Sequence, residues 1–340
     1  MAVTSGVRRI LVWLEVNGQR FPCLQGSANQ TASKQSATFS AHLAMTAPGA
    51  LAALQNLGEN SAKLIVGTRT LVDGELDRAD FDFIARTIQV SGRCKSAKLH
   101  QSKTAEKFNN KKPDEIIKDL AGRVGLELDA AASDVLAGKI WQIDHAKLTD
   151  NVSYAAVIHK LAELEGLRWW VKDGKLVMRA ENDGAAYLVR YAAPAGAPVV
   201  CDAMQLRVSC NFQAAKTGKV TVKSWNQKKK KVFQATAVIG GAGGTTNYQY
   251  HVPGLTQDHA DKHAKSRAKE HARHEFTVAL TMVGDPDIDA AMKLRLQGTP
   301  FDQDYDIESI SHSIGQGGHS MAISAKSAKT GRVAGVEGGA

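Results

Sequence analysis

Strict alternation of apolar and polar residues dominates the first hundred positions of the chain. Residues 37–45 (ATFSAHLAM) place an apolar side chain at every second position, as a strand with one buried face does. An apolar run at 8–16 is followed by Asn-Gly, a dipeptide typical of two-residue hairpin turns. Further strand-like runs lie at about 62–72 and 81–99. We therefore expect residues 1–102 to form a first β-barrel of short antiparallel strands.

The apolar spacing then changes to the 3.6-residue period of helices. The sequence PDE at 113–115 is typical of a first helical turn, and Gly125 suits the end of that helix. A second helix is expected over about 153–165, with Ser153 as its N-cap. These features predict a helix-containing middle domain over residues 103–185.

Residues 167–179 (LRWWVKDGKLVMR) predict a hairpin that turns at an Asp-Gly pair. This turn pairs Trp169 with Met178 and Trp170 with Val177, so the two tryptophans face opposite sides of the hairpin. Trp169 shares its face with apolar residues, and we expect it in the core. Trp170 lies among basic side chains, where it either stacks on Arg or Lys stems within the chain or contacts a partner. It is a candidate subunit-interface residue.

Strand patterns return after the middle domain and predict a second β-barrel over residues 186–326. This region also contains a long helix, expected at 257–275. Residues 327–340 are rich in Gly and Ala and are expected to be a disordered tail. The predicted fold class is therefore mainly β with α+β insertions, in which two small antiparallel β-barrels are joined by a helix-and-hairpin middle region.

Composition changes this picture little. The 340 residues carry a formal net charge of +9, which makes nucleic acid or an acidic protein surface a plausible partner. No apolar run is long enough for a membrane-spanning helix, and the N-terminus lacks the pattern of a signal peptide, so we expect a cytoplasmic product. The four widely spaced cysteines suggest reduced, mostly buried thiols rather than a metal site or a disulfide framework.

The long helix contains four histidines, of which His259 and His263 are one turn apart. This spacing can hold a metal, but neither zinc-protease motif is present and the helix is crowded with lysines and arginines. We expect a solvated basic helix without a metal. Its alanines at every fourth position form a smooth stripe that can dock closely on a sheet; they are Ala260, Ala264, Ala268 and Ala272.

The four-lysine run Lys228, Lys229, Lys230 and Lys231 lies at the tip of a predicted hairpin. Its alternatives are a solvated or partner-facing tip and a nucleic-acid contact. The glycine-rich segment 240–247 is expected from its composition to be a flexible linker or loop. We do not expect it to bind phosphate, because no Gly-Lys-Ser/Thr follows it. No nucleophile motif, paired acid and base, metal site or cofactor site is evident. We predict that the chain is not an enzyme and has no cofactor.

Three stretches have a distinctive order along the chain. They are KTAEKFNNKKPDEIIKDLAGRVGLEL (103–128), DNVSYAAVIHKLAELEGLRWWVKDGKLVMR (150–179) and DYDIESISHSIGQGGHSMAISAK (304–326). In this order they resemble the phage late-control D family, the baseplate hub proteins of contractile tails, which are related to the hub module of type VI secretion spike proteins. Weaker likeness covers 205–240 and 257–275.

The resemblance implies two tail-tube-like barrels per chain and a homotrimer whose six barrels adapt a hexameric tail tube to a trimeric spike. It further implies the tape-measure protein and other baseplate proteins as partners, and DNA contact only in the channel. The location would be the baseplate of a virion or of a tail-like bacteriocin particle (a tailocin), assembled in the bacterial host cytoplasm. The alternatives are a basic nucleic-acid-binding protein and a tail-associated cell-wall hydrolase.

Overall fold

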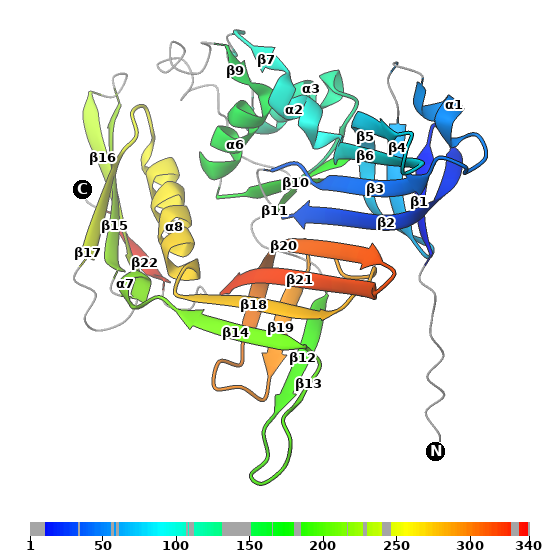
Figure 1. Cartoon of the computed structure of the whole chain (residues 1–340). Coiled ribbons are helices and arrows are strands. Elements are labelled where there is room, and N and C mark those ends of the chain that lie inside the picture. Colours follow the sequence, from blue (N-terminus) through cyan, green and yellow to red (C-terminus); the bar gives the residue numbers. More distant parts are fainter. Residues whose placement is uncertain are drawn as a thin grey trace.

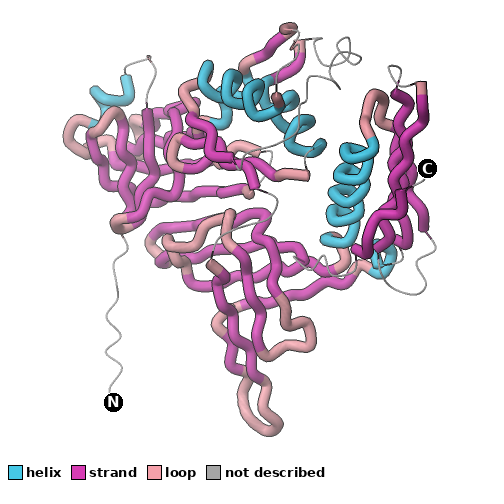
Figure 2. Tube along the Cα trace, turned by 180° about the vertical axis from the view of Figure 1, so that it is seen from behind, coloured by secondary structure: helices cyan, strands magenta, loops and turns pink. Residues whose placement is uncertain are grey.

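The computed structural model describes most of the chain. The described residues are 11–32, 35–55, 58, 61–106, 108, 112–130, 151–164, 166–179, 185–215, 217–226, 230–239, 246–327 and 333–338. Two β units lie side by side, and helices and smaller sheets flank them (Figure 1). The same arrangement is seen from behind in Figure 2.

The first barrel is a closed antiparallel ring of six strands, in the order β1-β4-β5-β6-β3-β2, which β1 and β2 close by pairing with each other. Its core is apolar, and the predicted Asn17-Gly18 turn is confirmed by positive φ angles at both residues. The elements are β1 (Val12–Val16), β2 (Gln19–Thr31), β3 (Thr38–Ala44), α1 (Ala50–Gln55), β4 (Ser61–Val66), β5 (Arg69–Asp82) and β6 (Thr87–Cys94).

The second β unit is a curled sheet in the order β14-β18-β21-β20-β19-β12-β13, packed around its own apolar core. One of its pairs, β12 with β19, is parallel. The strands are β12 (Ala186–Ala192), β13 (Val200–Cys201), β14 (Gln205–Cys210), β18 (Phe276–Val283), β19 (Lys293–Gln297), β20 (Asp304–Gly315) and β21 (Gly318–Ser327). The predicted fold class, mainly β with helices between the β units, is confirmed. Of the two predicted small antiparallel barrels, the first is a closed ring, while the second unit is an open, curled sheet with one parallel pair.

The two units repeat the same arrangement of five strands. The order β2-β3-β6-β5-β4 in the first barrel matches β14-β18-β21-β20-β19 in the second unit, and every neighbouring pair in both series is antiparallel. Both long hairpins also carry a bulge at the corresponding place, between Leu76 and Arg78 in β5 and between Ile307 and Ser309 in β20. The chain therefore contains a structural repeat.

Strands β2 and β20 join the two units into one continuous sheet. β1 pairs with β2 up to Pro22, and from Gly26 to Thr31 β20 occupies the same edge of β2, opposite β3. Ile314 of β20 is 3% exposed and joins the core of the first barrel. The junction thus combines a backbone ladder with shared apolar burial, which fixes the relative position of the two units.

The middle region packs above the junction. Its helices α3 and α6 match the predicted ones, and the Ser153 hydroxyl accepts a hydrogen bond from the Ala156 amide, as expected of an N-cap. The elements are α2 (Ser96–Gln101), β7 (Lys103–Thr104), α3 (Pro113–Arg123), β8 (Glu127–Ala130), β9 (Val152–Ser153), α6 (Tyr154–Leu164), β10 (Arg168–Lys172) and β11 (Lys175–Arg179).

A lateral unit is inserted between β14 and β18. In Figure 1 helix α8 lies between its four-stranded sheet, in the order β17-β15-β16-β22, and the rest of the molecule. The predicted alanine stripe is confirmed, because all four alanines of α8 are buried in a core shared with the middle region. The elements are α7 (Phe212–Ala215), β15 (Thr217–Asn226), β16 (Lys231–Ile239), β17 (Thr246–His251), α8 (Gln257–Arg273) and β22 (Val333–Gly338).

Two assignments made from the sequence were wrong. The long helix does not belong to the second barrel, because its apolar stripe is covered by β15, β16 and α6 rather than by the core of that unit. The tail 327–340 is not disordered throughout, because β22 pairs with the edge of β16. A partner strand distant in sequence supplies those hydrogen bonds, which local composition does not reveal. The domain boundaries themselves stay a prediction.

Candidate functional site

The hairpin β10–β11 carries a buried tryptophan on each of its two faces. Its register is the predicted one, with Trp169 opposite Met178 and Trp170 opposite Val177. Trp169 is 2% exposed and lies in the core of the middle region, while Trp170 is 8% exposed on the other face. Trp170 lines a cavity of about 80 Å³ together with residues of both β units, among them Leu71, Val72, Asp289 and Ala290. This burial favours the intramolecular alternative for Trp170 over a partner contact.

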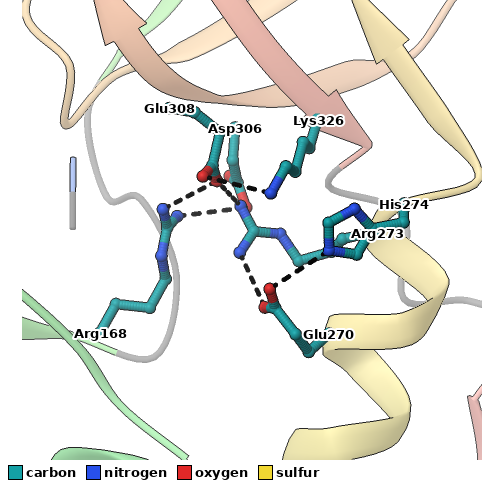
Figure 3. A network of polar contacts seen from close by, with 7 residues as sticks. All are labelled: Arg168, Glu270, Arg273, His274, Asp306, Glu308 and Lys326. Atoms are coloured by element: carbon teal, nitrogen blue, oxygen red, sulfur yellow. Dashed lines mark hydrogen bonds and ion pairs between the residues drawn. The ribbon is translucent and has the colours of Figure 1, made fainter. Parts of the chain in front are cut away.

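A cluster of charged side chains connects three regions of the molecule (Figure 3). Arg168 of the hairpin and Arg273 at the end of α8 both contact Glu308 of β20, with N–O distances of 3.0 and 2.6 Å. Arg273 also contacts Asp306 at 3.3 Å, and the Lys326 ammonium lies 3.5 Å from the second Glu308 oxygen. We call these five residues, Arg168, Arg273, Asp306, Glu308 and Lys326, the ionic cluster.

The ionic cluster is largely withdrawn from water. The side chains of Arg273 and Asp306 are 9% and 6% exposed. Burial and the neighbouring Arg273 lower the pKa of the Arg168 guanidinium, an effect that Glu308 and Asp306 oppose. Charges in such a setting are tolerated when partners compensate them, and removing one partner leaves the others uncompensated. The cluster therefore holds the hairpin, helix α8 and the second β unit in one orientation.

Sequence reasoning missed the ionic cluster. Its members are spread between positions 168 and 326 and belong to a hairpin, a helix end and two strands, so no local pattern connects them. Asp306 gave no signal, because Tyr305 and Ile307 on either side of it place it on the polar face of the predicted strand, whereas the structure buries all three. A buried carboxylate requires a cationic partner, but the sequence does not say which one.

The histidines of α8 correct a prediction. The helix is not simply solvated, because His259 and His263 are 6% and 3% exposed. His259 Nδ1 lies 2.7 Å from the Thr256 hydroxyl, and His271 Nε2 lies 2.8 Å from the Tyr250 hydroxyl. These contacts arise because α8 is enclosed between its sheet and the middle region, whereas the charge pattern alone suggested an exposed helix.

A second histidine pair is buried in the β20–β21 hairpin. His312 Nδ1 and His319 Nε2 are 3.0 Å apart, and the two residues are 2% and 5% exposed. Burial and the adjacent His319 lower the pKa of His312 to about 4. Burial likewise lowers the pKa of His319, while Asp285 opposes that shift. The pair is therefore uncharged at neutral pH, and one ring donates a hydrogen bond to the other.

The lysine tip is described in part. Lys228 and Lys229 lie outside the described residues, as does most of the predicted linker 240–247, whose last two residues begin β17. Lys230 is in the turn with a positive φ, and Lys231 begins β16; both side chains are exposed. Their exposure is compatible with either predicted alternative, a solvated or partner-facing tip or a nucleic-acid contact.

The described residues include no group of three or more His, Cys, Asp or Glu side chains placed to bind a metal ion. Cys23, Cys94, Cys201 and Cys210 are free, as predicted, although Cys94 alone among them is buried. No described helix is both long and apolar enough to cross a membrane.

A polar groove of about 400 Å³ runs along the junction between the two β units. It is lined by Gln25, Gly26, Ser27, Ser40, His42, the 313–318 segment and Ser320.

Comparison with known proteins identifies the fold. No family model and no curated protein matches the sequence. Among solved structures, a tail protein from Neisseria meningitidis MC58 aligns over 94% of this chain and 97% of its own, with a TM-score of 0.72 and 14% identity. The 43 kDa tail protein of prophage MuSo2 from Shewanella oneidensis covers 93% and 98%, with a TM-score of 0.66 and 14% identity.

A third similar structure comes from a secretion system. An Escherichia coli component of the type VI secretion system, described as structurally similar to the T4 bacteriophage tail proteins gp27 and gp5, aligns over 94% of this chain and 78% of its own. Its TM-score is 0.60 and its identity 9%. At these identities the likeness concerns the fold, and the chain is similar to tail proteins over nearly its whole length.

Proposed function

We propose that the chain is a structural hub of a contractile phage tail or of a phage-derived tail-like particle. The observation that carries the proposal is the repeat of two β units joined in one sheet, in a fold that tail proteins share over more than nine-tenths of the chain. A chain with two equivalent units makes six units in a trimer, so a trimer can match a hexameric tube on one side and a trimeric spike on the other.

The proposal includes the partners and location that the late-control D resemblance implies. These are a homotrimer, the spike, the tube, the tape-measure protein and other baseplate proteins, at the baseplate of a particle assembled in the host cytoplasm. The role is mechanical rather than enzymatic. Its support is the rigid connection of all regions through the β2–β20 ladder and the ionic cluster.

The native mass of the purified chain tests the proposal. Light scattering at moderate salt is expected to give about three times the 36.4 kDa of one chain. A trimer that also binds the tube protein on co-expression would support the hub. A monomer that fails to assemble with both tube and spike proteins would contradict it.

A nucleic-acid-binding role is the second candidate, favoured by the +9 charge and the exposed Lys230 and Lys231. DNA affinity that falls steeply between low and moderate salt would support it. Clearing of a cell-wall substrate in a zymogram would instead support a hydrolase.

A further inference from the structure

Among the ten strands of the structural repeat, two edges have no partner strand in the described part of the chain. β14 pairs with β18 on one side, and no described strand lies against its other edge. β4 covers β5 from Arg69 to Glu75, but beyond Asp77 β5 pairs with β6 alone. Such edges present unpaired N–H and C=O groups and are templates for another strand.

The internal repeat contains the equivalents of these two edges, and there they pair with each other. In the second unit β20 corresponds to β5, and its segment beyond the bulge pairs with β2 of the first barrel. In the first barrel β2 corresponds to β14 of the second unit. The internal β2–β20 junction is therefore a template for a junction between β14 of one copy and β5 of the next.

We propose that β14 of one chain pairs antiparallel with residues 78–82 of β5 in a second copy, in the register of the internal junction. This inference rests on the proposed function, in which copies form a ring, and names the surfaces that meet. Repetition of a head-to-tail contact of this kind gives a ring when the rotation between copies closes, as it does in the proposed trimer.

The bulges and the strand pairings determine the register. Residues that lie side by side across neighbouring strands of one unit have their equivalents in the other unit. In the first barrel such a row consists of Arg78, Ser91, Ser40 and Ser27. The equivalent row in the second unit consists of Ser309, Ser324, Ala279 and Arg207. Ser27 therefore corresponds to Arg207, and Ser313, its partner in the internal junction, corresponds to Asp82. The register places Arg207 opposite Asp82.

The resulting pairs are complementary on both faces of the sheet. On one face the exposed Arg207 meets the exposed Asp82, whose Oδ1 is held by the amides of Ile84 and Ala85. On the other face Val208 meets Phe81 and Leu206 meets Phe83. A slip by one residue would turn Arg207 toward the apolar face, so the pattern specifies this register.

Exposure of the equivalent positions supports the same conclusion. Ile314, which β2 covers at the internal junction, is 3% exposed, whereas Phe83 at the equivalent position is 70% exposed. Leu206, Val208 and Phe81 are half-buried, while Ala28 and His312, the equivalents of Val208 and Phe81, are buried. A copy docked on these edges gives the apolar positions the cover that their equivalents already have.

A single substitution tests the register, because native Cys210 falls opposite Ala79. The Ala79→Cys variant treated with copper phenanthroline is expected to give a disulfide-linked ladder of chains on a non-reducing gel. The ladder should disappear when Cys210→Ser is added to Ala79→Cys. Asp80→Cys is the matched control, because that side chain faces the opposite side of the sheet and should not crosslink to Cys210.

The native mass of the same samples separates this inference from the proposed function. An oligomer of the expected mass in which the Ala79→Cys variant does not crosslink would overturn the pairing and leave the trimer standing. A monomer that gives no crosslink and fails to assemble with both tube and spike proteins would contradict both. Arg207→Glu is expected to shift the mass toward that of a single chain, whereas Lys219→Glu, an equal charge change on the distant β15, should leave the oligomer unchanged. An unchanged mass for Arg207→Glu would also count against the register.

Discussion

The first barrel and the second β unit share five strands in the same order, yet they bury different kinds of side chain. Residues Asp306, His312 and His319 are buried in the second unit, whereas the buried residues described in the strands of the first barrel are apolar. The first barrel closes on itself through β1, while the second unit is interrupted between β14 and β18 by the lateral unit. Both units have an apolar core of their own, but the open sheet also depends on charges supplied by its neighbours.

The largest expected effect is therefore in the second unit, at Glu308. The Glu308→Gln variant removes the carboxylate that Arg168, Arg273 and Lys326 contact, and leaves Asp306 as the one remaining carboxylate of the ionic cluster beside two buried guanidinium groups. We expect the free energy of unfolding to fall by about 3–5 kcal/mol. A denaturant titration measures this, and Glu127→Gln, at a pair of exposed side chains, should change it by no more than about 0.5 kcal/mol. A loss at Glu308 as small as that of the control would refute the dependence on neighbouring charges.

Truncation of two equivalent core residues allows the stability of the two units to be compared directly. Leu43 in β3 and Met282 in β18 occupy the same place in the repeat and are 0% and 5% exposed. Truncation of either to Ala is expected to cost about 2–4 kcal/mol. Leu43→Ala should be the more damaging, because a closed ring cannot collapse around a cavity as far as an open sheet can. Equal losses in parallel thermal and denaturant titrations would show that ring closure does not matter here.

The buried histidine pair gives the second unit a pH dependence of its own. An unfolded histidine titrates near pH 6.5, whereas the pKa of His312 is about 4 in the folded chain. Between these values the unfolded state binds the proton and the folded state does not. Stability is therefore fully present above about pH 6.5 and falls as pH decreases toward 4.

We expect this loss to amount to about 2 kcal/mol between pH 7 and 4.5. His312→Gln should flatten that part of the stability profile relative to the wild type, as measured by urea titrations at both pH values. The exposed His251→Gln is the control and should retain the wild-type slope. The same slope in His312→Gln and the wild type would mean that other groups control the acid sensitivity.

Much of the fold could be predicted from the sequence because many of its elements are determined by residues close together in the chain. The turns at Asn17-Gly18 and Asp173-Gly174, the helices α3 and α6 and the register of β10–β11 follow from neighbouring residues. The pairing of β2 with β20 joins residues almost 300 positions apart, and no local pattern encodes it. The same limit explains why the ionic cluster and the pairing of β22 were missed, and why the sequence left two alternatives open for Trp170.

The smallest expected effect concerns a contact that looks similar to the ionic cluster but is exposed. Arg69 of the first barrel forms an ion pair with Asp287 in the loop before β19 of the second unit, and their side chains are 64% and 61% exposed. Water and salt screen such a pair, so Asp287→Asn should change the free energy of unfolding by about 0.5 kcal/mol or less. If a double-mutant cycle with Arg69→Gln measured a coupling of several kcal/mol, the units would be held together by this surface contact. A negligible coupling would leave the β2–β20 ladder and the buried charges as what fixes their orientation.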